Sequence, residues 1–235
     1  MEAEIMKNDK AVKIIGDALR DGRKTLSEYE AKQVLASYDI PVTKEVLLKD
    51  KKNLENAIRK IGYPLVMKGC SAQIAHKTEK GLIHVDIRSI KEAKKAFNEI
   101  MDGMKGFEGG VLAQEMIKGR RELVMGLTRD AQFGPCVMFG LGGIFTEILK
   151  DISFRRAPLK RSDASDMMKE IRGHKILDAV RGMEAADKKL LTDMLINIGR
   201  IGLEIPEVSE IDLNPVIISG SNPVVVDALI VLEKI

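Results

Sequence analysis

The chain reads Asp212-Leu213-Asn214-Pro215 near its C-terminus and, after a turn, Val224-Val225-Val226-Asp227. The residues between the two apolar runs are of types that favour turns, so the runs are predicted to pair as a hairpin. Two carboxylates and an amide oxygen then lie on neighbouring strands and face one pocket. Such hard oxygen ligands suit Mg²⁺, which shares its remaining positions with water and substrate phosphates. An acidic hairpin edge with Asn-Pro in a turn is the alternative, because short Asp/Asn patterns are common.

Length, charge and hydropathy indicate a globular protein. The 235 residues are enough for one large domain or two small ones. The net charge of +3 is small beside 31% charged residues, which argues against a nucleic-acid partner. No apolar run approaches the roughly 18 residues that span a bilayer, and the N-terminus lacks the apolar segment of a signal peptide. We therefore expect no membrane partner.

The two cysteines, Cys70 and Cys136, stand beside separate strand-like runs with no second thiol nearby. This spacing favours neither a disulfide framework nor a zinc site. Two free thiols in a reducing compartment are the simpler interpretation, which predicts a cytoplasmic protein.

Helical and strand patterns alternate and predict two α/β lobes. Residues 1–25 have apolar positions at helical spacing and are predicted to form an N-terminal helical extension. Residues 26–110 are predicted to form a small α/β subdomain whose helices start at capping boxes, Ser27 with Glu30 and Ser89 with Glu92. Its strands are expected over 46–48, 65–68 and 83–87.

Residues 111–235 are predicted to form a larger subdomain that is richer in strands. Its strands are expected over 111–114, 123–128, 136–139, 144–149 and 153–157, and its helices over 162–171 and 190–201. We expect a cleft between the two lobes, because ligands commonly bind in such clefts.

Lys68 ends a buried apolar strand and precedes a loop bounded by Gly69 and Gly81. Isolated burial of an ammonium is costly, so its charge is predicted to reach an anion such as a phosphate, or solvent. Backbone N–H groups of the loop are possible phosphate ligands, although the spacing does not match a Walker A motif. His76 lies in this loop, and neutral imidazole is a good nucleophile toward phosphorus. A lone loop histidine is more often a surface residue.

A glycine run at residues 140–143 precedes Glu147, and Arg155 follows soon after. Clustered glycines permit close backbone approach, but they also simply make turns. A glutamate facing Asn214 would complete a Mg²⁺ site, and an arginine would neutralise charge on a transferring phosphoryl group. A surface ion pair is the default alternative for both side chains.

Together these residues resemble an ATP-grasp domain. The resemblance rests on Lys68 and the glycine run, and on the segments 114–117, 119–123 and 212–215. More specifically, residues 26–32 (Leu-Ser-Glu-Tyr-Glu-Ala-Lys) and 75–78 (Ala-His-Lys-Thr) are similar to the separate beta subunit of ADP-forming acetyl-CoA (acyl-CoA) synthetases, relatives of succinyl-CoA synthetase. The likeness runs from about residue 26 to the end. It implies an α/β (α+β) ATP-grasp fold, with two α/β lobes and a nucleotide cleft between them.

The resemblance also implies a reaction and a partner. Acyl-CoA, ADP and phosphate reversibly give the free acid, CoA and ATP. In such enzymes a partner alpha subunit binds CoA and carries a mobile phosphohistidine, which brings the phosphoryl group to the ATP-grasp cleft. ATP/ADP and Mg²⁺ are the implied cofactors, and an alpha2-beta2 heterotetramer is the implied assembly.

The resemblance assigns five residues to the nucleotide. Lys68 would hold the ADP/ATP phosphates, and Glu115 the ribose. The backbone of Met116 or Ile117 would contact adenine, and Glu122 would support the nucleotide pocket.

The remaining roles concern metal and phosphoryl transfer. Asn214 and Asp227 would ligate Mg²⁺, and His76 would act as a second phosphoryl acceptor between the partner's histidine and ADP. Asp212, where succinyl-CoA synthetases have glutamate, would orient the incoming histidine. Arg155 would neutralise charge during transfer.

Other classes of protein stay open from sequence alone. A stand-alone ATP-grasp carboxylate–amine ligase would have no use for His76. A non-catalytic nucleotide-binding assembly module would keep the adenine pocket and tolerate loss of His76 and Asp212. An RNA-binding domain would show strongly salt-dependent binding.

Overall fold

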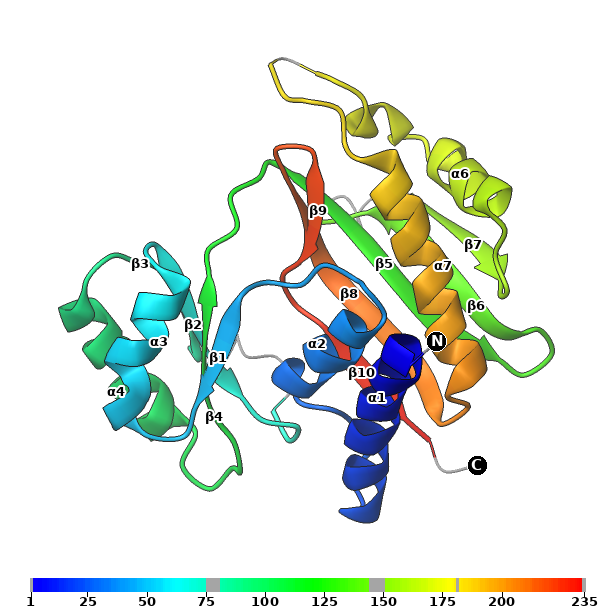
Figure 1. Cartoon of the computed structure of the whole chain (residues 1–235). Helices are drawn as coiled ribbons and strands as arrows, with labels where there is room; N and C mark the ends of the chain where they lie inside the picture. The colour runs from blue at the N-terminus through cyan, green and yellow to red at the C-terminus, as the bar shows by residue number, and fades with distance from the viewer. Residues whose placement is uncertain (1, 75–80, 144–150, 181, 234–235) are drawn as a thin grey trace. The chain divides into compact units, whose positions relative to one another are not determined.

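A computed structural model describes residues 2–74, 81–143, 151–180 and 182–233 of the chain, with side chains from residue 9 onward. The chain forms two compact units (Figure 1). Unit 1 consists of Met1–Leu26, Glu30–Val42 and Ile117–Ile235, and unit 2 of Ser27–Tyr29 and Thr43–Met116. Each unit has a hydrophobic core of its own, and the two cores share no residue.

Unit 2 is a four-stranded antiparallel sheet with two α-helices. The strands are β1 (Glu45–Leu48), β2 (Leu65–Cys70), β3 (Ile83–Ile87) and β4 (Gly110–Glu115), in the order β1-β4-β2-β3. The helices are α3 (Leu54–Ile61), which follows the 3₁₀ turn η1 (Lys51–Asn53), and α4 (Ile90–Gly103). Their apolar faces bury Leu54, Phe97 and Ile100 against one face of the sheet.

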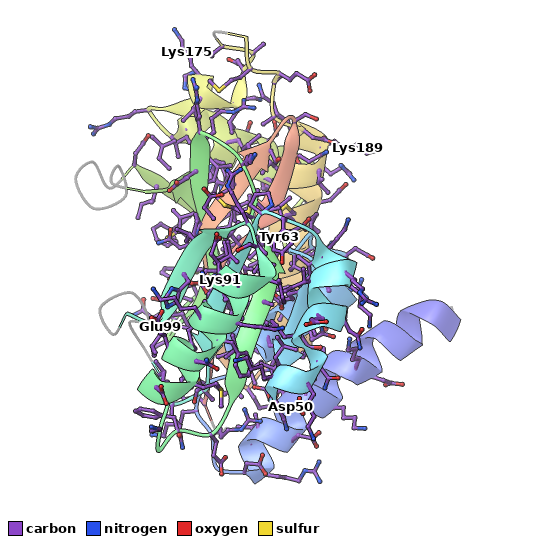
Figure 2. The ribbon with its side chains drawn as sticks, turned by 90° about the vertical axis from the view of Figure 1, so that its left-hand side faces the viewer. Asp50, Tyr63, Lys91, Glu99, Lys175 and Lys189 are labelled. Atoms are coloured by element: carbon purple, nitrogen blue, oxygen red, sulfur yellow. The ribbon has the colours of Figure 1, made fainter. Side chains whose placement is uncertain are left out.

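Helix α4 begins where the sequence pattern predicts. The Ser89 side chain accepts a hydrogen bond from the Glu92 N–H at 3.2 Å, and the Glu92 carboxylate accepts one from the Arg88 N–H at 2.8 Å. These bonds satisfy N–H groups that a helix start otherwise leaves without partners. Exposed charged residues such as Lys91 and Glu99 lie on the outer side of this helix (Figure 2).

Unit 1 is built on a six-stranded antiparallel sheet. Its strands are β5 (Arg121–Asp130), β6 (Gly134–Leu141), β7 (Ile152–Arg156), β8 (Val208–Ser219), β9 (Asn222–Val225) and β10 (Leu229–Leu232). The order is β10-β8-β5-β6-β7, and β9 also pairs with β8. Its helices are α1 (Glu2–Arg20), α2 (Glu28–Ser37), α6 (Arg161–Glu170) and α7 (Lys188–Glu204), with the 3₁₀ turn η2 (His174–Leu177). The first two residues of α2 are grouped with unit 2.

The two faces of this sheet differ. Leu127, Val137 and Ile211 align across β5, β6 and β8 and are buried in the core, where α6 and α7 pack against the sheet (Figure 1). Side chains alternate along a strand, so the neighbouring aligned residues Gly126, Met138 and Asp212 lie on the opposite face. We call this opposite side the Asp212 face.

The predicted strands within the described residues are confirmed, and so are the helices over 162–171 and 190–201. Three groupings differ from the expected ranges. Residues Glu30–Val42, which were expected in the small subdomain, belong to unit 1. Helix α1 contributes Ala11 and Ile15 to the core of unit 1 and is therefore part of it. Residues 111–116 belong to unit 2, because β4 pairs with both β1 and β2. The strand expected at 144–149 lies outside the described residues.

Strand β10 is an element that the sequence pattern did not single out, although it pairs with β8. Within the described residues, no helix combines the length and apolar character that crossing a membrane requires.

Candidate active site

The C-terminal hairpin has the predicted geometry. Strands β8 and β9 pair antiparallel, with Val216 opposite Val225 and Ser219 opposite Asn222. Strand β10 then pairs with the first half of β8, with Leu229 opposite Asp212. Residues 226–228, Asp227 among them, therefore lie opposite residues 213–215 of β8, where the Val226 N–H donates to the Pro215 carbonyl at 3.0 Å.

Negative charge is concentrated around Asp212, where Glu210 and Asp227 lie nearby. Asp212 and Asn214 are two positions apart on β8, and Asp212 is partly buried while Asn214 is exposed. Burial raises the pKa of the Asp212 carboxyl, and the nearby charges of Glu210 and Asp227 raise this pKa further. A carboxylate destabilised in this way is a favourable position for a cation or for a hydrogen-bond donor.

The oxygen atoms of Asn214 and Asp227 suit a magnesium ion that is also held by water and substrate. They do not form a metal site made of protein ligands alone. Among the described residues, no three His, Cys, Asp or Glu side chains are grouped so that they could hold a metal ion. Magnesium is commonly held by only one or two protein oxygens, with water and phosphate oxygens completing its octahedron. This donor set therefore suits Mg²⁺ bound together with a phosphate-bearing substrate.

Glu122 on β5 lies against the glycine run. The Gly142 N–H donates to the Glu122 carbonyl at 2.8 Å. A Cβ added at Gly142 would lie 2.8 Å from the backbone of Glu122, and one at Gly143 would lie 2.8 Å from its Oε2. Both possibilities open from sequence are observed, because Gly142 makes a close backbone approach and Gly143 lies in a turn with a φ of 64°. Glu147 lies outside the described residues.

Arg155 is not brought together with the other candidates. It aligns with the buried Val137 and forms an ion pair with Glu170 of α6, so it lies on the helix-covered side of β7. Its neighbour Arg156 alternates to the Asp212 face and is exposed. The sequence pattern could not separate two adjacent arginines, because only the strand register decides which face each one occupies.

In unit 2, Lys68 has a carboxylate partner that the sequence analysis did not identify. Its Nζ lies 2.9 Å from Oε1 of Glu28, and both side chains are almost completely buried. The prediction that the buried ammonium needs an anion is thus met within the protein. Glu28 lies in the first turn of α2, in one of the segments that carry the family resemblance. Its place in that segment was the sequence signal that could have pointed to Glu28.

Glu115 is the last residue of β4, and Met116 follows it. The Glu115 N–H donates to the Lys44 carbonyl at 2.9 Å, and the Lys44 N–H donates to Oε1 of Glu115 at 2.7 Å. The Met116 N–H donates to the Pro64 carbonyl at 3.2 Å. Ile117 is the first residue of the long C-terminal part of unit 1. His76 lies outside the described residues.

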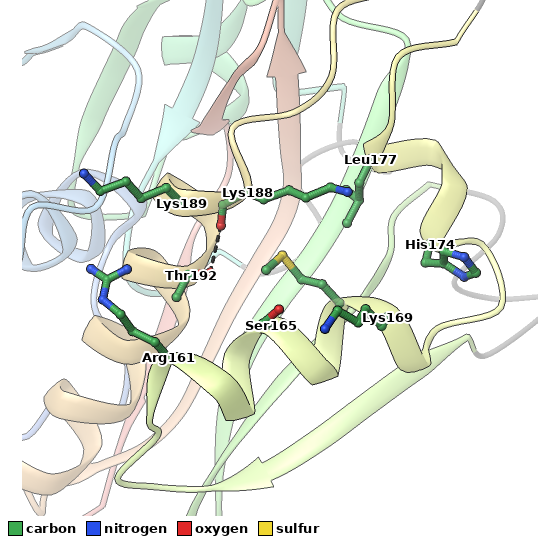
Figure 3. A pocket seen from close by; sticks show the side chains of 9 residues that line it. Arg161, Ser165, Lys169, His174, Leu177, Lys188, Lys189 and Thr192 are labelled. Carbon is green, nitrogen blue, oxygen red and sulfur yellow. Dashed lines mark hydrogen bonds between the residues drawn. The ribbon is translucent and has the colours of Figure 1, made fainter.

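A separate hollow of about 290 Å³ lies in unit 1 where α6, η2 and the start of α7 meet (Figure 3). Its walls include Arg161, Lys169, Lys188 and Lys189. Three of these cations already pair with carboxylates, namely those of Asp193, Asp166 and Asp178. The ends of Lys189 and His174 point in opposite directions (Figure 3). The hollow therefore lacks the convergent charge of an anion site.

Comparison with known proteins settles the class. The family model of the ATP-grasp domain matches residues 17–232 of this chain. The class that the two sheets and the acidic hairpin define is thus the ATP-grasp protein, as the sequence motifs implied.

Three known proteins show which group of ATP-grasp proteins this chain resembles in sequence and structure. The chain is 42% identical over 231 residues to "Acetate--CoA ligase [ADP-forming] I subunit beta" of Pyrococcus furiosus, covering 95% of this chain and 98% of that one. It is 37% identical to the Archaeoglobus fulgidus "Acetate--CoA ligase [ADP-forming] I", of which it covers 34%. A solved acetyl-coenzyme A synthetase 1 from Ca. Korarchaeum cryptofilum is 44% identical with a TM-score of 0.85, over 95% of this chain and 100% of that one.

That solved structure is in complex with coenzyme A and Mg-AMPPCP, and its phosphohistidine segment points towards the nucleotide binding site. The chain described here belongs to the ATP-grasp family and, within it, to the beta subunits of ADP-forming acetate–CoA ligases. The expected fold is confirmed, and a subunit of this kind implies a partner alpha subunit.

Proposed function

We propose that this chain binds Mg²⁺ and nucleotide for an ADP-forming acyl-CoA synthetase, and that it transfers a phosphoryl group between a phosphohistidine and ADP. The complete reaction converts acyl-CoA, ADP and phosphate reversibly into the free acid, CoA and ATP. The observation that carries this proposal is the group of Asp212, Asn214 and Asp227 at the β8–β9 hairpin, in a chain that matches beta subunits over nearly its whole length.

Residues of unit 2 and the start of the following segment are proposed to bind the nucleotide. Lys68 contributes positive charge to the phosphates, in exchange for or together with its contact to Glu28. Glu115 accepts a ribose hydroxyl. Because the Met116 N–H donates to Pro64, the Met116 carbonyl and the Ile117 N–H are the backbone groups assigned to adenine.

Residues of unit 1 are proposed to prepare the transfer. Asn214 and Asp227 hold Mg²⁺, which when bound neutralises charge on the phosphate oxygens. Asp212 accepts a hydrogen bond from the imidazole of the phosphohistidine and so fixes the orientation of the ring. Glu122, seated against Gly143, supports the nucleotide pocket. His76 is the proposed second phosphoryl acceptor.

We assign the CoA-binding half of the reaction to a partner alpha subunit, in an alpha2-beta2 heterotetramer. The Archaeoglobus relative supports this division, because this chain corresponds to only 34% of it. We assign the complex to the reducing cytoplasm, since Cys70 and Cys136 lie in separate units and form no disulfide.

The test is ATP formation by the purified chain with and without its partner subunit, from acetyl-CoA, ADP and phosphate. The complex is expected to form ATP, whereas the chain alone is expected to bind Mg·ADP without turnover. Asn214→Ala and Asp227→Asn should each raise the Mg²⁺ concentration needed for half-maximal rate. ATP formation by the chain alone, or none by the complex, would contradict the proposal.

The role of His76 is tested with labelled phosphate and acetyl-CoA in the absence of ADP. We expect acid-labile label on this chain, and we expect His76→Ala to lose both the label and ATP formation. Label confined to the partner, with ATP still formed by the variant, would make the transfer direct.

A further inference from the structure

One row of residues crosses the Asp212 face through five strands. The strand register aligns Leu229 with Asp212, Asp212 with Gly126, Gly126 with Met138, and Met138 with Phe154. Directly opposed residues of an antiparallel sheet share a face. Leu229, Asp212, Gly126, Met138 and Phe154 therefore form one continuous line, which we call the Asp212 row, and all of it lies within unit 1.

The two ends of the Asp212 row are apolar and exposed. Leu229 is 41% and Phe154 46% exposed. Single exposed apolar residues are common on protein surfaces; what distinguishes these two is that they share one row with Asp212. The next two positions of β7 on this face, Ile152 and Arg156, are also exposed.

Gly126 lies in the middle of the Asp212 row. Gly126 carries no side chain next to Asp212, and a Cβ there would lie only 2.4 Å from the Ile211 carbonyl oxygen. Glycine is therefore required by the close approach of β5 and β8. The same added atom would lie 3.6 Å from Cε of Met138, so the Met138 methyl group lies next to Gly126. The row thus places Asp212 beside a buried glycine, with Leu229 on one side and Met138 and Phe154 on the other.

The chemistry of the row fits a peptide segment that presents an imidazole. Asp212 offers a carboxylate oxygen as acceptor for a ring N–H, between Leu229 and Gly126 in the row. The flanking apolar side chains suit the residues before and after the histidine. We propose that Leu229, Met138 and Phe154 dock the phosphohistidine-bearing segment of the partner subunit and thereby position its imidazole at Asp212.

This inference rests on the proposed function, since it requires a phosphohistidine that reaches this chain. The Korarchaeum relative has such a segment pointing towards its nucleotide site. The inference adds Leu229, Met138 and Phe154 as the apolar residues that hold the segment.

The experiment uses the complex of this chain with its partner subunit. Labelled phosphate, acetyl-CoA and excess Mg·ADP are mixed with the complex together, so that each labelled ATP requires a new delivery of the phosphoryl group by the partner's histidine. Phe154→Ser and Leu229→Ser are each expected to slow transfer of label to ADP by about tenfold, the scale set by losing one large apolar contact. Affinity for Mg·ADP and the thermal midpoint should not change, and Phe154→Leu should restore most of the rate.

Phe133→Ser is the matched control. Phe133 is 57% exposed in the turn between β5 and β6 of the same unit, outside the Asp212 row. The proposal is overturned if Phe154→Ser and Leu229→Ser transfer label at the wild-type rate, or if Phe133→Ser slows transfer equally. It is also overturned if the row variants change only self-association of the chain in sedimentation. A wild-type complex that never forms ATP would instead overturn the proposed function and this proposal with it.

Discussion

Lys68 and Glu28 form an ion pair that is almost completely buried, with 2.9 Å between Nζ and Oε1. A buried pair is strongly destabilised when one partner is removed, because the other charge stays in surroundings of low polarity. If nucleotide phosphates are a second partner for Lys68, removal of Glu28 should make the protein more dependent on nucleotide for stability.

We therefore predict that Glu28→Gln lowers the free energy of unfolding by roughly 3 kcal/mol without ligand. Saturating Mg·ADP should raise the thermal midpoint more in this variant than in the wild type. Glu30→Gln, two residues further along the same helix, removes a half-buried partner of Arg23 and serves as control. An equal or smaller ligand-induced shift in Glu28→Gln would show that Lys68 does not exchange its carboxylate for phosphate.

Asp212 gives a prediction about pH. Burial, Glu210 and Asp227 raise its pKa in the folded chain, so the native state binds this proton more tightly than the unfolded state does. By linkage, this group lowers the stability of the fold as pH rises from its ordinary value through the raised value. Asp212→Asn should consequently increase the free energy of unfolding at pH 7 in the absence of metal and nucleotide. That gain should vanish below the ordinary pKa of about 3.9.

Asp130 serves as a control, because its pKa is shifted in the opposite direction to that of Asp212. Its Oδ1 accepts backbone N–H bonds from Phe133 and Gln132, which lower its pKa. Asp130 therefore stabilises the fold above its ordinary pKa, and this contribution is lost as pH falls through the lowered value. Urea unfolding of Asp212→Asn and Asp130→Asn across pH 3 to 7 should move stability in opposite directions. Asp212→Asn should also lose phosphoryl transfer, and a variant that keeps full transfer would remove Asp212 from the mechanism.

At the scale of elements, Arg121 joins three segments near the start of β5. Its guanidinium is buried and donates to the carbonyls of Ile176 at 3.2 Å and Gly220 at 2.8 Å. One side chain thus ties β5 to η2 and to the β8–β9 turn. We predict that Arg121→Ala costs roughly 2–4 kcal/mol, because charge-assisted hydrogen bonds and the packing of a buried side chain are lost.

The loss at Arg121 should be local in hydrogen exchange. Amides of residues 174–178 and of the β8–β9 turn are expected to exchange faster in Arg121→Ala than in the wild type. Arg121→Lys keeps the charge but cannot donate in two directions with the same geometry, so an intermediate effect is expected. An even rise in hydrogen exchange over the whole of unit 1 would show that Arg121 does not act locally on η2 and the β8–β9 turn.

Elements also show how far sequence reasoning reaches. The hairpin of β8 and β9 was predictable because apolar runs flank residues that favour turns, and β3 was found over 83–87 as expected. The partner of Lys68 and the face that Arg155 occupies did not follow from pattern alone. Glu28 meets Lys68 from 40 residues away, and the face that Arg155 occupies depends on the pairing of β7 with β6. Local patterns specify elements, whereas partners distant in sequence depend on register and packing.

For the whole molecule, the two separate cores are the main organising fact. Unit 2 is nearly one continuous stretch, Thr43–Met116, whereas unit 1 is assembled from segments on either side of it. The sequence pattern predicted two lobes with their boundary at residue 110. In the structure Gly110 begins β4, the strand at the centre of unit 2.

Separate cores predict separate local unfolding. Ile100 is fully buried in the core of unit 2, and Ile198 is fully buried in that of unit 1. Truncation of either to alanine should cost roughly 2–5 kcal/mol through lost transfer energy and a cavity. In Ile100→Ala, faster hydrogen exchange should be confined to residues 43–116, because no core residue is shared. In Ile198→Ala, faster hydrogen exchange should appear in α7 and β5–β8. Because unit 1 contains the segments on both sides of Thr43–Met116 in the sequence, unfolding of unit 1 should also free the two ends of unit 2. Equal acceleration in both units by Ile100→Ala would mean that the chain unfolds as one cooperative body, and that the division into two cores has no thermodynamic counterpart.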